Sequence, residues 1–259
     1  MRWEELSVAE IETLDREATV LLLPLGSVEQ HGRHLPVGTD SILAAAVSRE
    51  AAKLIPRRVV VLPPPWYGLS QHHMRFAGTV TLRAETMMGL VEDIAQSVVA
   101  HGFRRLVLVN GHGGNAGLVD VVSAKLGHQY YGRARVAGLT YFQLARDRIA
   151  KLRLSSTGGM GHACEFETAM MQYVRPDLVD MKRATVTYPN TGSAYVSTDL
   201  LIGSRVRTYN DFGDLSESGI LGDPSLASPE AGARFHEAVV EELVRFIEEF
   251  SRWPIQRSR

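Results

Sequence analysis

Cysteine and long hydrophobic runs are almost missing from this sequence, and each absence excludes a class of protein. The one cysteine, Cys164, cannot form an internal disulfide, which excludes a disulfide-stapled secreted domain and is typical of a reducing compartment. The first strongly apolar stretch, residues 18–25, is far shorter than the roughly 20 residues that cross a bilayer. The uncharged stretch 59–74 contains three consecutive prolines, which would break a spanning helix. We therefore expect no transmembrane segment.

An excess of charge of one sign is missing too. The 28 lysines and arginines nearly balance the 29 aspartates and glutamates, for a net charge of −1. Such a chain has no general attraction to nucleic acids or to anionic membranes, and the sequence contains no local basic patch, so we expect neither partner. The first residues lack the basic start and apolar run of a signal peptide, and we expect a cytoplasmic protein.

The periodicity of the chain predicts an α/β fold. Short runs of valine and leucine alternate with amphipathic stretches of helical period. The runs are almost continuously apolar, which is typical of strands that are covered on both faces in a parallel sheet. The predicted strands are 19–25, 58–62, 105–110 and 135–141, and the predicted helices are 40–54, 84–99 and a C-terminal helix that Ser228 caps.

The chain shows no internal repeat and no linker. With 259 residues, 45% of them hydrophobic, it can bury a sizeable core, and we expect a single domain over residues 1–259. The segment 185–227 is irregular and rich in Gly, Ser, Thr, Asp and Tyr. A loop of this length is usually functional or an interaction arm, so it is expected to close a pocket of its own or of a neighbouring subunit.

The first candidate site is the loop after strand 19–25. This loop carries Glu29 and His31, which can point the same way at a spacing of two, and Asp40 returns at the start of the next helix. Carboxylate and imidazole groups are ligands that suit Zn²⁺ or Mn²⁺. The alternative is a polar loop in which Asp40 only caps the helix.

The second candidate is the glycine-rich loop 110–115, which follows strand 105–110. Its glycines permit a tight turn close to a ligand, and His112 stands where it would meet the first loop, because ligands bind at the carboxyl ends of parallel strands. A phosphate-binding loop is the alternative. The loop lacks both the Lys-Ser/Thr of a P-loop and the spacing of a dinucleotide fingerprint, which favours a metal.

The third candidate is the segment 158–171, with Glu167 as its main residue. If the chain is helical from residue 165, Glu167 falls in the apolar stripe, where a carboxylate is costly unless it is paired or binds a metal. Glu165 falls on the opposite side, as a supporting or simply exposed residue. His162 lies at the mouth of this helix and could act as an acid or base near neutral pH.

The sequence allows two roles for a pair of histidines further along the chain. His72 and His73 follow a proline-rich stretch, and they either line the pocket or lie on the surface as ordinary hydrogen-bonded histidines. Cys164 has no evident basic partner except His162, which argues against a nucleophilic thiol.

Together these motifs resemble the creatininase (creatinine amidohydrolase) family. The resemblance rests on GSVEQHGRHLP at 26–36 with Asp40, NGHGGN at 110–115, HACEFET at 162–168 and GILGDPSLAS at 219–228. It implies a three-layer α/β/α domain with a mainly parallel central sheet, assembled as a homohexamer. It also implies two divalent metal ions per subunit, Zn and/or Mn, with Fe as a further option.

The resemblance implies a ligand set as well. Glu29, Asp40 and His112 would hold one ion, and His31 would hold the second, with Asp40 bridging the two. Creatinine-cleaving members carry another glutamate ligand and a preceding aromatic where this chain has Gly114 and Gly113. The missing carboxylate is therefore assigned to Glu167, and creatinine itself becomes a less expected substrate.

The expected activity is that of a metal-dependent amidohydrolase. It would cleave a non-peptide or cyclic amide C–N bond in a small molecule with a metal-activated water, with His162 and Glu167 as the catalytic residues. The alternatives on the same site are a formamide deformylase and a peptide-trimming hydrolase of the mycofactocin type. From other classes, the alternatives are a catalytically inactive binding or scaffold protein of this fold and a nucleotide enzyme that binds phosphate through Gly111–Asn115.

Overall fold

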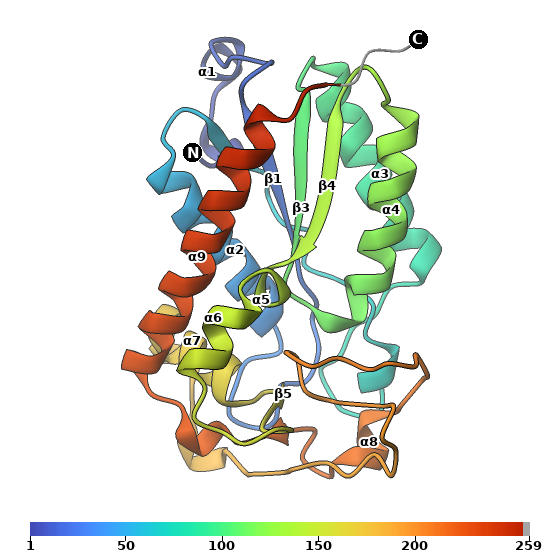
Figure 1. Cartoon of the computed structure of the whole chain (residues 1–259), viewed down its shortest axis with the longest axis vertical. Coiled ribbons are helices and arrows are strands. Elements are labelled where there is room, and N and C mark those ends of the chain that lie inside the picture. The colour runs from blue at the N-terminus through green and yellow to red at the C-terminus, as the bar shows by residue number, and fades with distance from the viewer. Residues whose placement is uncertain (256–259) are drawn as a thin grey trace.

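Four apolar runs form a parallel sheet in the order β2-β1-β3-β4 in the computed structural model, which describes residues 1–255 (Figure 1). The pairing of β1 with β3 is continuous from the first to the last residue of both strands. The strands are β1 (Val20–Leu25), β2 (Val59–Val61), β3 (Arg105–Asn110) and β4 (Arg135–Thr140).

Helices cover both faces of this sheet. Successive side chains of a strand point to opposite faces, so β1 sends Leu21, Leu23 and Leu25 into one core and Val20 and Leu22 into the other. One face packs against α2 (Thr39–Leu54), α7 (Glu165–Val174) and α9 (Pro229–Arg252). The other face packs against α3 (Ala84–Ala100) and α4 (Ala116–Gln129) (Figure 1). The predicted three-layer α/β/α architecture is confirmed.

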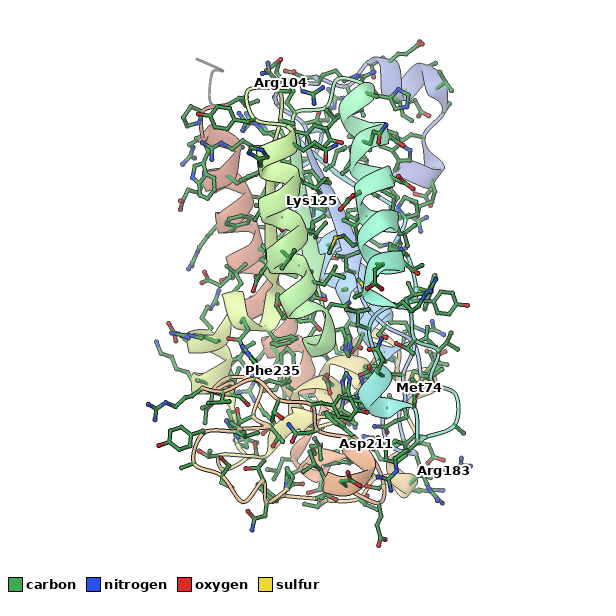
Figure 2. All side chains as sticks on the ribbon, turned by 90° about the vertical axis from the view of Figure 1, so that its right-hand side faces the viewer. Met74, Arg104, Lys125, Arg183, Asp211 and Phe235 are labelled. Atoms are coloured by element: carbon green, nitrogen blue, oxygen red, sulfur yellow. The ribbon has the colours of Figure 1, made fainter. Side chains whose placement is uncertain are left out.

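Polar pairs and close backbone contacts join the helices within each layer. In the α3/α4 layer, Lys125 Nζ lies 2.6 Å from Glu92 Oε1, and Lys125 is visible on the outer side of α4 in Figure 2. In the other layer, α9 crosses α7 at Gly232, where an added Cβ would lie 1.9 Å from the carbonyl oxygen of Ala169. The absence of a side chain at Gly232 therefore permits this helix crossing.

The element boundaries differ from the predicted ones by one residue at several ends. Helix 40–54 begins one residue earlier, at Thr39, and helix 84–99 ends one residue later, at Ala100. The predicted strands 19–25 and 58–62 are shorter, because their outer residues lie outside the parallel ladder. The predicted start of the last helix is confirmed, since Ser228 Oγ accepts the Ala231 N–H at 3.1 Å.

The segment 185–227 runs across the carboxyl end of the sheet, at the lower end of Figure 1. It contains the one-turn helix α8 (Phe212–Leu215), and its strand β6 (Leu221–Gly222) pairs antiparallel with β5 (Met160–His162). The remaining helices are α1 (Val8–Glu12), α5 (Tyr141–Leu144) and α6 (Arg146–Leu152), and short 3-10 helices cover Trp3–Glu5, Gln71–His73, Gly113–Asn115, Pro176–Leu178, Met181–Arg183 and Pro224–Leu226. Within residues 1–255, none of the helices combines the length and the apolar character needed to span a bilayer.

Candidate metal centre

Five buried donor side chains meet at the carboxyl end of the sheet. None of them exposes more than 6% of its surface. The sequence predicted these five as metal ligands, and the structure brings all of them together. They are Glu29 and His31 after β1, Asp40 in the first turn of α2, His112 after β3, and Glu167 in the first turn of α7.

Asp40 lies at the middle of this cluster. Its Oδ1 is 3.2 Å from His31 Nε2, and its Oδ2 is 3.0 Å from His112 Nδ1. A second carboxylate lies close to each histidine: Glu167 Oε1 is 3.9 Å from His31 Nε2, and Glu29 Oε2 is 3.2 Å from His112 Nε2. One oxygen of Asp40 therefore faces His31, and the other faces His112.

Backbone carbonyls orient both histidines. His31 Nδ1 lies 3.1 Å from the carbonyl oxygen of Glu29, and His112 Nε2 lies 2.9 Å from that of Leu69. A carbonyl oxygen only accepts, so these nitrogens carry protons. Once the opposite nitrogen loses its proton, its lone pair faces Asp40, as is usual for metal-binding histidines.

Two buried atoms of the cluster make no well-oriented hydrogen bond. They are His31 Nε2 and Asp40 Oδ2, which face Asp40 Oδ1 at 3.2 Å and His112 Nδ1 at 3.0 Å as ion pairs. One donor atom each from His31, Asp40 and Glu167 lies within 4.8 Å of the others. A divalent cation would satisfy these atoms, so the residues present fit a metal of the Zn²⁺ or Mn²⁺ kind.

The cluster holds protons in the metal-free protein. Burial disfavours the charged form of His31, but the carboxylates of Asp40, Glu167 and Glu29 outweigh it and raise the pKa of His31 to about 10. Burial also disfavours the charged form of His112, but the carboxylates of Glu29 and Asp40 outweigh it and raise the pKa of His112 to about 9. Burial also raises the pKa of Glu29, to about 7. A cation that binds here must therefore displace protons.

Gly114 lets the chain approach His112 closely. A Cβ at this position would lie 2.4 Å from His112 Nε2 and 2.4 Å from the carbonyl oxygen of Leu69. Any side chain there would separate these two hydrogen-bonded groups. The loop thus has no room for the glutamate that the resemblance places at this position, and Glu167 is the carboxylate that faces His31.

Of the two roles expected for Glu165, the supporting one agrees with the structure and the exposed one does not. This residue is completely buried, and its two carboxylate oxygens accept the N–H groups of Leu154 and Ser155 at 2.9 and 2.8 Å. The helical projection placed Glu165 away from the apolar core, but the loop before β5 folds back over that side of α7. Glu165 therefore holds a loop in place and lies outside the donor groups of the cluster.

His73 is the site residue whose importance the sequence left open. It is completely buried, and its Nε2 is 3.2 Å from Glu29 Oε1. The side-chain oxygen of Gln30 accepts the Gly32 N–H, and its side-chain nitrogen donates to the carbonyl oxygen of Gly219. The same nitrogen donates to His73 Nδ1 at 2.8 Å. The proton of His73 is thus on Nε2, which makes this residue a donor facing Glu29 rather than a metal ligand. Only the tertiary contact with Gln30 distinguishes it from an ordinary histidine.

His162 lies beside the donor cluster with one nitrogen free. Its Nε2 is 2.6 Å from the carbonyl oxygen of Gln30, while its Nδ1 is 3.6 Å from Glu29 Oε1. Burial and the neighbouring charge of His31 hold the pKa of His162 well below its usual value. The neutral ring therefore offers Nδ1 as a proton acceptor.

The donor cluster opens into a cavity of about 100 Å³. Phe212 of the segment 185–227 packs against two histidines that line this cavity, with its ring centroid 4.2 Å from that of His73 and 5.4 Å from that of His162. Leu200 of the same segment also lines the cavity. Part of the segment 185–227 therefore lies against the cavity of its own chain.

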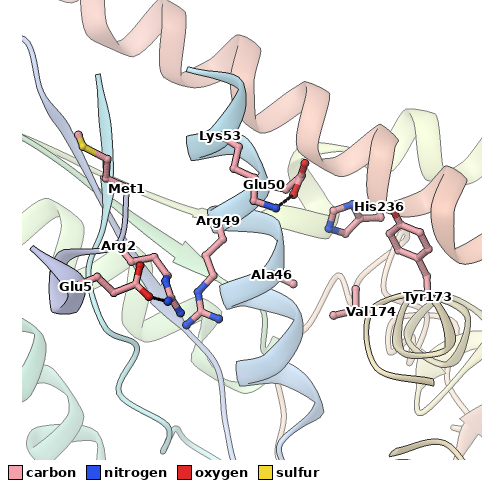
Figure 3. Close-up of a pocket in the computed structure, with 10 residues that line it drawn as sticks. All are labelled: Met1, Arg2, Glu5, Ala46, Arg49, Glu50, Lys53, Tyr173, Val174 and His236. Carbon is pink, nitrogen blue, oxygen red and sulfur yellow. Dashed lines mark hydrogen bonds and ion pairs between the residues drawn. The ribbon is translucent and has the colours of Figure 1, made fainter. Parts of the chain in front are cut away.

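A larger cavity, of about 630 Å³, lies outside the donor cluster (Figure 3). Four of its charged side chains form two ion pairs: Lys53 Nζ is 2.7 Å from Glu50 Oε2, and Arg2 contacts Glu5. It shares no residue with the donor cluster. Because buried donors of the cluster line the smaller cavity, that cavity is the candidate active site.

A buried set of histidines and carboxylates at the carboxyl edge of a parallel sheet defines the class of this protein as an α/β/α enzyme with a metal-binding donor set. Comparison with known proteins then gives the family. The family described as creatininase, creatinine amidohydrolase, matches residues 4–247. The chain belongs to the creatininase family of amidohydrolases, which are hydrolases of carbon–nitrogen bonds.

Individual relatives agree with this assignment. The chain is 32% identical over 240 residues to the mycofactocin precursor peptide peptidase of Mycobacterium ulcerans (strain Agy99). This alignment covers 90% of this chain and 85% of that protein. It is 31% identical over 243 residues to the creatinine amidohydrolase of Pseudomonas putida, with 89% of each chain covered. The solved structure "Creatininase Mn" superposes with a TM-score of 0.80 at 31% identity, over 96% of this chain and 97% of that chain.

Proposed function

We propose that this chain hydrolyses an amide C–N bond with two divalent ions, Zn and/or Mn, bound at the donor cluster. Glu29, Asp40 and His112 would hold one ion, and His31, Asp40 and Glu167 would hold the other. The observation that carries the proposal is the position of Asp40, with one oxygen toward each histidine at 3.2 and 3.0 Å. When bound, such ions supply the Lewis acidity that polarises an amide carbonyl and lowers the pKa of water.

His162 moves the proton in this proposal. Its Nε2–H is held by the Gln30 carbonyl, so Nδ1 takes the proton of the attacking water and then gives it to the leaving nitrogen. Protonation of the leaving nitrogen is needed because an amine leaves poorly as an anion. The burial of the donor residues limits their contact with bulk water.

The substrate proposed is an amide other than creatinine. Gly113 and Gly114 replace the aromatic and the carboxylate of the creatinine-cleaving pattern, and the site therefore has a different shape. A lactam, a formamide or a short modified peptide fits the same chemistry. The likeness to the mycofactocin precursor peptide peptidase supports peptide trimming as the second candidate.

The family resemblance supports a homohexamer, and the single cysteine supports a cytoplasmic location. Native mass spectrometry of the purified protein tests the assembly directly. A monomer at micromolar concentration would contradict the hexamer without affecting the chemistry of the site.

Metal content per subunit and hydrolysis are the decisive measurements. Protein purified without a polyhistidine tag should contain about two divalent ions, His31→Ala should lose metal and activity together, and His162→Ala should keep metal but lose turnover. Fully active, metal-replete His162→Ala protein would refute the proton-transfer role. If the wild type binds no Zn²⁺ or Mn²⁺, the chain is a binding protein of this fold, and stabilisation by nucleotide alone would indicate a phosphate site at Gly111–Asn115.

A further inference from the structure

A second cavity continues from the candidate active site. It has a volume of about 340 Å³ and shares Gly113, Phe142 and Leu200 with the cavity of the donor cluster. One wall comes from the chain after β3 and β4, and the other comes from residues 197–207. The two cavities therefore adjoin each other at these shared residues.

Gly113 lies at this boundary without a side chain. A Cβ added at Gly113 would meet no atom within 4 Å, whereas one at the adjacent Gly114 would collide with His112. Gly113 also has an ordinary backbone φ, since it is absent from the positive-φ glycines of residues 1–255. A side chain is thus sterically and conformationally allowed at this position, and it would occupy the junction of the two cavities.

The second cavity carries one unpaired charge, which is positive. It contains two charged residues, Asp199 and Arg207. Asp199 is buried and already paired, with its Oδ2 2.7 Å from Arg153 Nη2 and 2.8 Å from the Gly158 nitrogen. Arg207 is exposed, and no carboxylate of the described part of the chain lies within 4.0 Å of it. The hydroxyls and the amide along the walls, from Thr140, Gln143, Ser197 and Ser204, already make hydrogen bonds within the protein, so Arg207 is the charged group available to a ligand.

We propose that this second cavity binds the part of the substrate beyond the scissile bond, and that the substrate is an extended amide with a carboxylate at its far end, such as a short acylated peptide. The inference rests on the proposed amide hydrolysis and adds the substrate class. In the reaction, the water oxygen joins the carbonyl carbon, the C–N bond breaks, and the proton passes to the nitrogen. The products are a carboxylate and an amine that carries the distal carboxylate toward Arg207.

The test uses metal-loaded, full-length protein and three sets of probes. The first set contains N-acetylated di- and tripeptides with a free C-terminal carboxylate, the second contains the same peptides as C-terminal amides, and the third contains small formanilides and lactams. We expect the wild type to hydrolyse the first set with roughly 1.5- to 5-fold higher kcat/KM than the second, because an exposed ion pair contributes modestly.

Two variants test the cavity itself. Arg207→Gln should abolish the preference for the free carboxylate, while the control Arg205→Gln should keep it, because Arg205 packs over the Tyr195 ring outside the cavity. Gly113→Trp should fill the junction and reduce hydrolysis of the extended peptides to below about one tenth. Its metal content, measured in parallel, should equal that of the wild type.

The outcomes separate the two proposals. Metal-dependent hydrolysis of formanilides or lactams without any hydrolysis of the peptides would overturn the extended substrate and leave the amidohydrolase proposal standing. Equal rates on free and amidated peptides, or an unchanged preference in Arg207→Gln, would overturn the role of Arg207. If metal-loaded wild type hydrolyses none of the three sets, the proposed function and this inference fail together.

Discussion

Glu165 and Glu167 stand two residues apart in the first turn of α7, and we predict opposite effects when each is changed to glutamine. Glu167 Oε1 faces His31, while its Oε2 accepts the Ala163 N–H at 2.5 Å. Glu165 uses both oxygens to accept backbone N–H groups. Glu167→Gln should therefore affect metal binding, and Glu165→Gln should affect the stability of the fold.

The expected magnitudes follow from these contacts. Glutamine at 165 keeps one acceptor and leaves the second N–H facing a donor, which costs about 1–3 kcal/mol and lowers the Tm by roughly 2–12 °C for a chain of this size. Glutamine at 167 can retain the Ala163 contact but loses one ion. An ion present at 100 times its Kd stabilises the protein by about 2.7 kcal/mol, so the metal-induced rise in Tm should fall by roughly 5–11 °C.

Elemental mass spectrometry and thermal unfolding, each with chelator and with added Zn²⁺, measure both effects on the same samples. Glu165→Gln should bind the full complement of ions at a lower Tm, and Glu167→Gln should bind about one ion fewer with an unchanged Tm in chelator. If Glu165→Gln loses an ion while Glu167→Gln keeps the full complement, the assignment of the ligand on α7 is wrong.

Two further predictions concern the fold and the protons of the cluster. Gly232→Ala should lower the free energy of unfolding by about 3 kcal/mol or more, because the new Cβ collides with backbone on α7. The control Gly89→Ala, in open space on α3, should instead raise the free energy of unfolding by up to about 1 kcal/mol. Urea denaturation measures both, and equal effects would contradict the close crossing. Zn²⁺ binding should release protons near neutral pH, because the pKa values of His31 and His112 are raised to about 10 and 9 in the metal-free protein, so the apparent affinity should rise as the pH increases toward 9. Calorimetry in buffers of different ionisation enthalpy measures this release, and buffer-independent heats would argue against protonated histidines.

The sheet and the donor cluster were predictable from the sequence for a common reason. The strands are continuous valine and leucine runs, which are typical of a parallel sheet. Ligands bind where parallel strands end, so the local pattern predicted Glu29, Asp40 and His112 as site residues. Glu165, His73 and Phe212 did not, because their surroundings come from segments distant in the chain. The exposure of Glu165 depends on a loop outside its helix, His73 on the amide of Gln30, and Phe212 on an irregular segment without periodicity.

The donors of the cluster lie in the segments after β1 and β3 and at the start of α7. Without a metal, these three segments are connected through the pairing of the strands and the packing of the helices. Bound ions would tie these three segments at one point, so local opening of any of them would require release of the others. In hydrogen-exchange terms, the first turns of α2 and α7 and the loop after β3 would then exchange as one cooperative unit in the metal-loaded protein and as separate units after chelation. The metal centre would thus set the cooperativity of this edge of the molecule as well as its chemistry.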